Sequence, residues 1–564
     1  MRLFGKVESN TFELLLAASV VLPCLLIVFG NIHAVLNWFL TDDAFYYFQV
    51  ARNVSEGIGF TFDGINFSNG FHPLWMLICI PIFSLARYDL ILPLRLMVLV
   101  LAVINAATAI MLFRLLQRFI KLELAAMIAV VWAFAADFQR LTAKEGLETG
   151  INAFFLVLLW QQLTSLNDRE KLGPDGLKRI FIAGFVAALA IFSRLDNVYL
   201  VIASAIWIWL RWWNPPHKNP DIKSAWIWRL KTGLAYNGII VALMLPYLIW
   251  NKISFGTFMP VSGQVKLWWG SLPNSVYGYR VTNLQELFVE LLSWDNKVGP
   301  WALLVKKIYQ GASLITDFQP QNAAILPTVW KLAGVSAVLL LLIIWLERDF
   351  FLHTASRLGL LPFLVGTLIQ AAYYKRYGSV PQKAWYWISE MLFLMICFAL
   401  LLMLLYRLFE RLGSNWIRHA MLGFMLVVML WQPIKFVYYL FGELENGRIQ
   451  ETHDYIDKAL FLGETFEPGT VIGIPGSGSW GYFCPEMIIF NMDGLINSYD
   501  YLIAIQQGRG ADFLAASGVQ YVIGNPYIMQ ETNPYGPMLE GHLELYTKYF
   551  PPYSSRRFVW SYIP

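Results

Sequence analysis

The first 440 residues alternate between long apolar runs and short polar segments, which is typical of a chain that crosses a membrane many times. A helix needs about 20 mainly apolar residues to span a bilayer, and eleven runs approach or exceed that length. They cover residues 12–38, 90–113, 122–140, 149–165, 179–195, 196–211, 232–250, 329–346, 358–374, 386–406 and 418–440. A shorter run at 73–86 predicts a re-entrant or interfacial helix, and a twelfth crossing stays open.

After residue 440 the long apolar runs end. Short β-type runs such as TVIGI (470–474) and VQYVIG (519–524) alternate with turn residues, and a helical stretch covers about 500–516. We therefore predict a polytopic α-helical membrane domain over residues 1–440, followed by a small α/β domain over 441–564.

One loop of the predicted membrane domain, at 251–328, contains the amphipathic segment NLQELFVELLSW. Its apolar residues Leu284, Leu287, Phe288, Leu291 and Leu292 share one face at helical spacing. The pattern predicts a helix that lies in the plane of the membrane interface.

Composition agrees with a membrane protein. Hydrophobic residues make up 57% of the 564 residues and charged residues 14%, and the mean hydropathy is +0.52, which excludes a single soluble domain. The small net charge of +4 gives no reason to expect a nucleic-acid partner. The four cysteines, at 24, 79, 397 and 484, have neither disulfide nor metal-site spacing.

The distribution of basic residues predicts the orientation. The segment MRLFGKVESN precedes the first apolar run without a cleavage-site pattern, so we expect a retained anchor with a cytoplasmic N-terminus. Most Lys and Arg of the loops then lie on the inner side, as the positive-inside rule requires. Loops 41–89 and 251–328 and the C-terminal domain lie outside. The short outer turns carry few basic residues. An anionic ligand on the outer side is one explanation for the exceptions, which are Lys144, Arg194, Lys375, Arg376 and Lys383.

The most informative polar residues are the adjacent acids Asp42 and Asp43, where the first span ends. Carboxylates beside a bilayer point to function, although an Asp pair at a helix start is also an ordinary N-cap. The aromatic residues that follow suggest a pocket wall, with Tyr46, His72 and Trp75 as candidate substrate contacts. For His72, an ordinary turn histidine is the alternative.

Two outer turns carry further candidates. Glu148, in AKEGLETG, either faces the same pocket or only favours the start of the next helix. Arg194, in SRLDN, either meets a phosphate or pairs locally with Asp196.

Cations next to aromatic residues stand at the outer ends of two later spans. Lys266, Arg376 and Lys383 would bind an anionic headgroup, or would be snorkelling cations of an aromatic belt. No HExxH, CxxC or EF-hand pattern occurs, so no metal site is predicted.

Five segments, in order, resemble the GT-C glycosyltransferases, particularly the branch similar to the terminal arabinofuranosyltransferase of mycobacterial cell walls. They are DDAFYYFQVARNVSEGIGFTFDGINFSNGFHPLW, GLETGINAFF, FSRLDNVYL, FGTFMPVSGQVK and GYFCPEMIIFNMDGLIN. The family counterparts are approximately DDAxIxxRYARNLAxGxGxxFNxGxxxxGYTxPLW, GMETALFAL, LARPEGLLL, YGxLLPNTFYAK and GYFSxxxVxxLDGLVN.

This resemblance implies an enzyme of the cell (inner) membrane that moves one sugar from a polyprenyl phosphate to a glycan, lipid or protein acceptor on the outer side. No metal or other cofactor is expected. Asp42 matches the first acid of the family's loop and would be the base, with Asp43 in support. Lys266 matches the family's Lys and is the first choice for the donor phosphate, ahead of Arg194, Arg376 and Lys383.

Three other functions stay open. A transporter or flippase would carry ionisable residues deep in its spans and repeated halves, and neither is clear. A metal-dependent oligosaccharyltransferase would need more acids near the first loop. A non-catalytic protein would bind glycan through its C-terminal domain.

Overall fold

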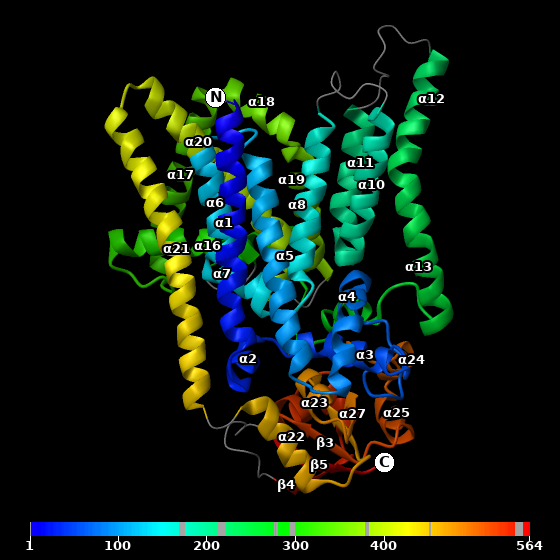
Figure 1. The fold of residues 1–564 in the computed structure, drawn as a ribbon. Helices are drawn as coiled ribbons and strands as arrows, with labels where there is room; N and C mark the ends of the chain where they lie inside the picture. Colours follow the sequence, from blue (N-terminus) through cyan, green and yellow to red (C-terminus); the bar gives the residue numbers. More distant parts are fainter. Residues whose placement is uncertain are drawn as a thin grey trace.

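A bundle of long helices carries a smaller α/β domain at one end (Figure 1). The computed structural model describes residues 2–167, 175–211, 222–275, 277, 280–293, 299–377, 383–450, 453–547 and 557–564. The largest core is continuous between the two parts, because Ile472, Trp480 and Tyr482 of the α/β domain pack with the buried side chains of the bundle.

The bundle consists of helices with short breaks between them. Its longer helices are α1 (Arg2–Val28), α5 (Leu92–Leu116), α6 (Leu122–Phe134), α8 (Thr149–Ser165), α10 (Gly176–Ser193), α11 (Val198–Arg211), α12 (Ile222–Gly233), α13 (Ile239–Phe255), α17 (Leu326–Leu346), α18 (Arg348–Leu358), α19 (Leu360–Tyr377), α20 (Ile388–Arg411) and α21 (Asn415–Ile449).

Every one of the eleven predicted runs is largely helical, but the predicted number of spans is not confirmed. Within the described residues, seven helices are long and apolar enough to cross a membrane, or up to nine if each of two bent pairs is one span. One pair, α6 with the segment to Lys144, bends by 52°, and the other, α18 with α19, bends by 71°. The run at 196–211 is a short apolar helix, as is the one at 73–86. A sequence pattern does not reveal such bends, because local packing produces them.

The end of the bundle nearest the α/β domain is built from short elements. These are α2 (Ile32–Trp38), α3 (Asp43–Ser55), α4 (Pro73–Phe83), the π-helix η2 (Arg140–Lys144), the 3-10 helix η4 (Leu195–Asn197), α14 (Val261–Trp269) and the 3-10 helix η7 (Ala384–Trp387). Pro73 lies in the first turn of α4, where a proline costs no hydrogen bond. Gly57 and Gly59 follow α3 with φ values of +83° and +112°, which favour glycine.

The α/β domain contains one five-stranded sheet with the order β2-β1-β3-β5-β4. The strands are β1 (Val471–Ile474), β2 (Ile488–Asn491), β3 (Tyr521–Gly524), β4 (Leu543–Thr547) and β5 (Phe558–Tyr562). The strands β2, β1 and β3 are parallel, and β5 and β4 are antiparallel to their neighbours. The helices of this part are α22 (Asp454–Thr465), α23 (Gly478–Phe483), α24 (Tyr499–Gln506), α25 (Gly510–Ala516), α26 (Pro526–Glu531) and α27 (Tyr535–Leu539).

The predicted β-type runs correspond to β1 and β3, and the predicted helical stretch corresponds to α24 and α25. Alternation of short apolar runs with turn residues was therefore sufficient to predict the class of this part. The boundary at residue 440 stays a prediction, since α21 continues to Ile449.

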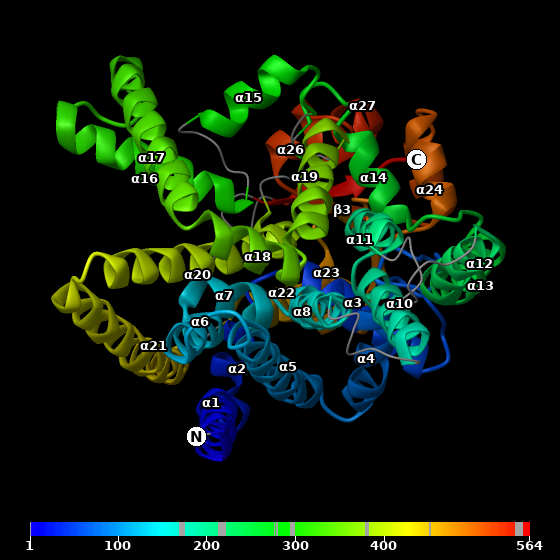
Figure 2. The same cartoon turned by 90° about the horizontal axis from the view of Figure 1, so that it is seen from above.

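The predicted amphipathic helix is α15 (Leu284–Leu292). Together with α16 (Gly299–Thr316) and α17 it lies at the periphery of the molecule, as Figure 2 shows along the long helices. The helix α16 runs across the long helices in Figure 1. The helices α15 and α16 both expose large apolar side chains, among them Leu284 and Phe288 of α15 and Leu314 of α16.

Candidate functional site

A small polar cavity lies where α3, η7, α14 and the α/β domain meet. Its volume is about 50 Å³, enough for about three to five water molecules. Its lining includes Asp43, Tyr46, His72, Glu148 and Lys266, which were singled out in the sequence. Other lining residues were not singled out there, among them Tyr47, Trp385, Tyr386, Leu495 and Ile496. Residues that are up to 453 positions apart in the chain therefore converge on one site, from Asp43 to Ile496.

Of the two adjacent acids at the start of the first predicted outer loop, Asp43 faces this cavity. It stands at the first position of α3, and its side chain is half-buried. Burial raises the pKa of Asp43 to about 6, with Lys266 acting against that rise and the charge of Asp42 adding to it. A carboxylate with a pKa of about 6 is ionised at neutral pH and yet basic enough to accept a proton.

Lys266 brings a positive charge to the same cavity. It lies on α14, and its ammonium donates a hydrogen bond to the Tyr386 hydroxyl, over whose ring it is also placed. Burial alone would lower the pKa of Lys266, but Tyr386 and the charge of Asp43 outweigh that effect, so the net shift is upward. The amine therefore stays protonated beside Asp43.

Asp42 is engaged elsewhere. Its carboxylate accepts hydrogen bonds from the Gly478 N–H at 2.8 Å, the Ser479 N–H at 2.8 Å and the Ser479 hydroxyl at 2.6 Å. These donors belong to the first turn of α23, where free N–H groups and the helix dipole favour an anion. Asp42 thus caps a helix, but that helix is α23 of the other domain and not α3, whose N-cap lacks a side-chain hydrogen bond.

The second acidic candidate, Glu148, joins the wall of the cavity. Its carboxylate accepts from Tyr47 at 3.1 Å and pairs with Arg194 at 2.8 Å. The His72 ring lies 3.6 Å from the same carboxylate, and burial lowers the pKa of His72 to about 4. His72 Nδ1 accepts from the Leu195 N–H, so the neutral ring carries its proton on Nε2, toward Glu148.

Arg194 forms the local ion pair that the sequence left open. It binds Asp196 at 2.8 Å as well as Glu148, and it lies 4.7 Å from the centre of the Tyr386 ring. The two carboxylates raise the pKa of Arg194 above its usual range, despite the opposing effect of burial, which is the largest single influence. With two carboxylates at its guanidinium, Arg194 holds the wall together, and its binding to a phosphate stays a prediction.

Three other predicted site residues lie outside the cavity lining. Lys383 is exposed near its rim, with its ammonium 5.2 Å from the Trp385 ring, and its charge acts on Asp43. Arg376 is exposed and donates to the Val281 carbonyl at 3.3 Å. Trp75 is fully buried in the core of the bundle, so the prediction of a substrate contact is not supported there.

Part of the cavity wall was missed from the sequence. Leu495 and Ile496 follow β2 in the MDGLIN segment and close the cavity from the α/β domain. The backbone of Gly70 packs against this loop so closely that an added Cβ would lie 1.9 Å from the Leu495 carbonyl oxygen. The segment had been noted only as a resemblance, since nothing local indicates that it reaches the first loop.

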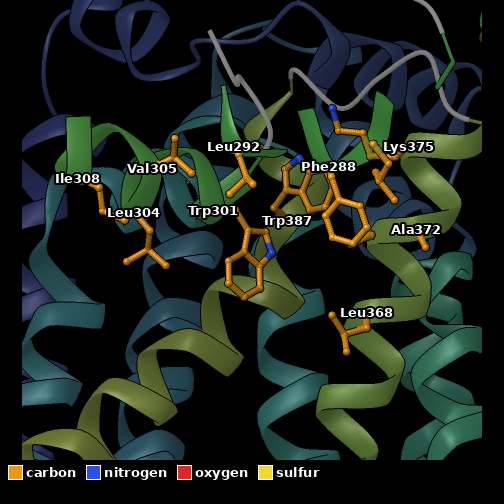
Figure 3. Close-up of a pocket in the computed structure, with 12 residues that line it drawn as sticks. Phe288, Leu292, Trp301, Leu304, Val305, Ile308, Leu368, Ala372, Lys375 and Trp387 are labelled. Atoms are coloured by element: carbon orange, nitrogen blue, oxygen red, sulfur yellow. The ribbon is translucent and has the colours of Figure 1, made fainter. Parts of the chain in front are cut away.

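An apolar groove adjoins the polar cavity. It has a volume of about 430 Å³ and is lined, among the described residues, by α15, α16, α19 and η7, including the cation Lys375. Figure 3 shows the apolar side chains Leu304, Leu368 and Trp301 along it, with Lys375 close to Phe288. The four residues of η7 separate the two spaces, because Trp385 and Tyr386 line the cavity and Trp387 lines the groove.

The acids near the cavity do not fit a metal ion. Both oxygens of Asp42 accept from α23, and Asp493 accepts four hydrogen bonds. Within the described ranges, no three His, Cys, Asp or Glu side chains are grouped as metal ligands. The oxygens of Asp42 and Asp493 already accept from N–H and O–H donors, so these two carboxylates are poorly suited to hold a metal ion.

Comparison with known proteins gives similarity at the level of fold. The structure resembles the oligosaccharyltransferase of Archaeoglobus fulgidus in its apo form, with a TM-score of 0.51 and 13% identity over 94% of this chain and 72% of that chain. The archaeal oligosaccharyltransferase AglB of the same organism, in complex with an inhibitory peptide and a dolichol-phosphate, matches with a TM-score of 0.46 and 12% identity over 95% of this chain and 71% of that chain. No family model matches, and a sequence search of curated proteins finds no similar sequence. The first similarity supports the GT-C fold that the sequence resemblance implies.

Proposed function

We propose that the protein is a membrane glycosyltransferase that moves a single sugar from a polyprenyl phosphate to an acceptor hydroxyl on the extracytoplasmic side. The observation that carries this proposal is that Asp43 and Lys266 line one cavity beside an apolar groove. A base, a cation and a lipid-sized channel are the parts that such a reaction needs. The GT-C fold agrees with this proposal but does not choose between donors.

Asp43 acts as the general base. The acceptor oxygen attacks the anomeric carbon, its proton passes to the Asp43 carboxylate, and the bond from that carbon to the phosphate oxygen breaks. The bonding electrons leave with the phosphate, and a single displacement inverts the anomeric carbon. This assignment differs from the sequence-based one, in which Asp42 had the first role. Asp43 replaces it because Asp43 lines the cavity, whereas Asp42 accepts three hydrogen bonds from α23.

Lys266 holds the leaving phosphate. Negative charge grows on the bridging oxygen as the bond breaks, and a fixed cation in a site of low dielectric stabilises that charge most effectively. Lys383 at the rim supplies a second cation. Lys375 holds the phosphate where the apolar groove meets η7. A monophosphate is a good leaving group, so no strong general acid is required.

The apolar groove receives the first isoprene units of the carrier. Its lining is mostly apolar, which suits a hydrocarbon chain, and among the described residues it includes the cation Lys375. The chain would lie on the side of α15 and α16, whose exposed apolar side chains suit contact with lipid. With the tail in the groove and the sugar in the cavity, the phosphate lies at η7.

The walls of the cavity belong to different elements. Trp385 and Tyr386 come from η7, and Leu495 and Ile496 come from the α/β domain. Another part of the wall is held together by contacts of Glu148 with Tyr47 and His72. These three residues would contact the sugar.

The decisive experiment is transfer by the purified protein in lipid nanodiscs, supplied with polyprenyl-phosphate sugars and a hydroxyl acceptor. Asp43→Asn should lower kcat by about 10²- to 10⁴-fold, the usual contribution of a general base. Lys266→Met should raise the donor KM and lower kcat. The exposed Asp500→Asn, on α24, is the matched control and should behave as wild type. Full activity of Asp43→Asn would refute the base assignment.

The same assay separates the rival reaction. An oligosaccharyltransferase would take a preassembled glycan from a diphosphate carrier, and the fold neighbour is an enzyme of that name. Transfer from a diphosphate-linked oligosaccharide, with none from monophosphate-linked sugars, would replace our proposal with that one. Failure with every lipid-linked sugar would favour a transporter or a binding protein.

A further inference from the structure

Asp493 is a buried acid of the α/β domain that joins three parts of the chain. It follows β2, and its carboxylate accepts four hydrogen bonds. One oxygen accepts from Tyr277 at 2.6 Å and Tyr535 at 2.7 Å, and the other accepts from the Gly476 N–H at 2.7 Å and Tyr46 at 3.0 Å. Tyr46 belongs to α3, Tyr277 to the segment after α14, and the remaining two donors to the α/β domain.

The first connection leads from Asp493 to the proposed base. Tyr46 lies three residues after Asp43 on α3, so both side chains are on one face of that helix. The Tyr46 hydroxyl is fixed from two sides, because it donates to Asp493 and accepts from the Ser477 N–H at 3.2 Å. Through this hydrogen bond Asp493 fixes the position of this face of α3 relative to the α/β domain.

The second connection leads from Asp493 to the proposed phosphate ligand. The Tyr277 ring stacks on Trp269 with the centroids 3.5 Å apart and the planes 9° apart. Trp269 is the last residue of α14 and is buried, and Lys266 lies one turn earlier on the same helix. Holding the Tyr277 hydroxyl therefore holds the end of the helix that carries Lys266.

We propose that Asp493 is a positioning residue that fixes the separation of Asp43 and Lys266, through Tyr46 on one side and Tyr277 on the other. This inference rests on the proposed function for its kinetic consequence only. Asp493 itself does not line the cavity, so it acts through these two tyrosines and not on the substrate.

The chemistry of the site explains why an acid stands at this position. Four donors converge, and a carboxylate offers two oxygens that only accept. An asparagine would offer one oxygen and would turn an N–H₂ group toward donors that then lose their partner. The contact atoms span segments that are 216 and 447 residues from Asp493 in the chain, so no local structure replaces them.

Tyr277→Phe is the cleanest test, since it removes one hydroxyl and leaves every charge in place. We expect kcat/KM to fall about 10- to 100-fold, as catalytic groups are displaced by up to about 1 Å. Most of this loss should come from a rise in the donor KM, because Lys266 is the group displaced. The control is Tyr562→Phe, which removes a hydroxyl of the α/β domain that donates to the Ala511 carbonyl at 2.7 Å, and it should leave kcat and KM unchanged.

Asp493→Asn adds a readout that a purely structural role would not move. The charge of Asp493 contributes to the raised pKa of Asp43, so its removal should shift the acid limb of the pH–rate profile to lower pH. Tyr277→Phe keeps that charge and should leave the limb in place. Wild-type kcat and KM in folded Tyr277→Phe would overturn the inference.

A measurement without turnover separates this inference from the proposed function. Trace acetylation of Lys266, followed by mass spectrometry, reports how tightly its amine is held against Tyr386. It should be faster in Tyr277→Phe than in wild type, and unchanged in Tyr562→Phe. If wild type transfers no sugar but this labelling increases, the positioning role stands and the proposed reaction fails. Unchanged labelling in Tyr277→Phe would reject the positioning role in either case.

Discussion

Asn in place of Asp42 should loosen the α/β domain from the bundle rather than remove the catalytic base. The Asp42 carboxylate accepts from two backbone N–H groups and one hydroxyl at the start of α23. Asn has a single accepting oxygen, so at least one of the two N–H groups loses its partner. The Ser479 hydroxyl can rotate and accept from the new amide, which limits the loss to that one N–H.

The size of the effect follows from these contacts. A hydrogen bond to a charged acceptor contributes about 1.5–3 kcal/mol, and an unsatisfied buried N–H costs a similar amount, so local opening should become easier by about 2–4 kcal/mol. At 1.4 kcal/mol for each factor of ten, this corresponds to an opening constant about 30- to 700-fold larger.

Hydrogen exchange measures this opening directly. Amides of residues 476–483 should exchange faster in Asp42→Asn by that factor, while β1 and β3 change little. Transfer activity should fall much less than in Asp43→Asn. Unchanged exchange at α23 together with a loss of transfer as large as that of Asp43→Asn would refute this reasoning and return the base to Asp42.

Three further outcomes are expected. Burial raises the pKa of Asp43 to about 6, and a general base must be ionised to accept a proton. We therefore expect kcat/KM to be constant near pH 7–8 and to fall tenfold per pH unit well below pH 6. A constant kcat/KM down to pH 5 would contradict the assignment. Gly70→Ala should lower activity about tenfold or more by displacing the Leu495 loop, as judged by transfer assays against Gly233→Ala, where an added Cβ meets nothing within 4 Å. Leu368→Trp should fill part of the groove and raise the KM of long-chain donors; an equal effect on a donor with a very short isoprenoid would show that the groove does not hold the tail.

The helical class of the bundle and the strands of the α/β domain could be predicted from the sequence because both depend on local periodicity. The number of spans could not. One bend, near Ala135, lies inside the apolar run at 122–140, and the other, near Gly359, lies between α18 and α19. The direction that a helix takes after a bend depends on its neighbours in the fold. Gly359 has a φ of +66°, which a pattern of apolar residues does not encode.

The sequence selected several residues that the structure brings into one cavity, but it did not predict the contacts among them. Asp43, Glu148 and Lys266 were all selected from the sequence and meet in one cavity. Which of two adjacent acids faces that cavity depends on Ser479, which lies 437 residues beyond Asp42. Likewise, no role was predicted for Asp493 in the MDGLIN segment, because its partners Tyr46 and Tyr277 are distant in the chain. Contacts between residues so far apart in sequence can be identified only in the folded structure.

The peripheral position of α15 and α16 bears on how the proposed lipid-linked donor would reach the site. The groove beside them is bordered by exposed apolar side chains such as Phe288 and Leu304, so a carrier already dissolved in the bilayer could arrive sideways. Its search would then be two-dimensional, and the relevant concentration would be the number of carriers per membrane area. Dilution of the carrier in the lipid would slow the enzyme at constant bulk concentration, whereas a water-soluble acceptor would follow ordinary three-dimensional kinetics.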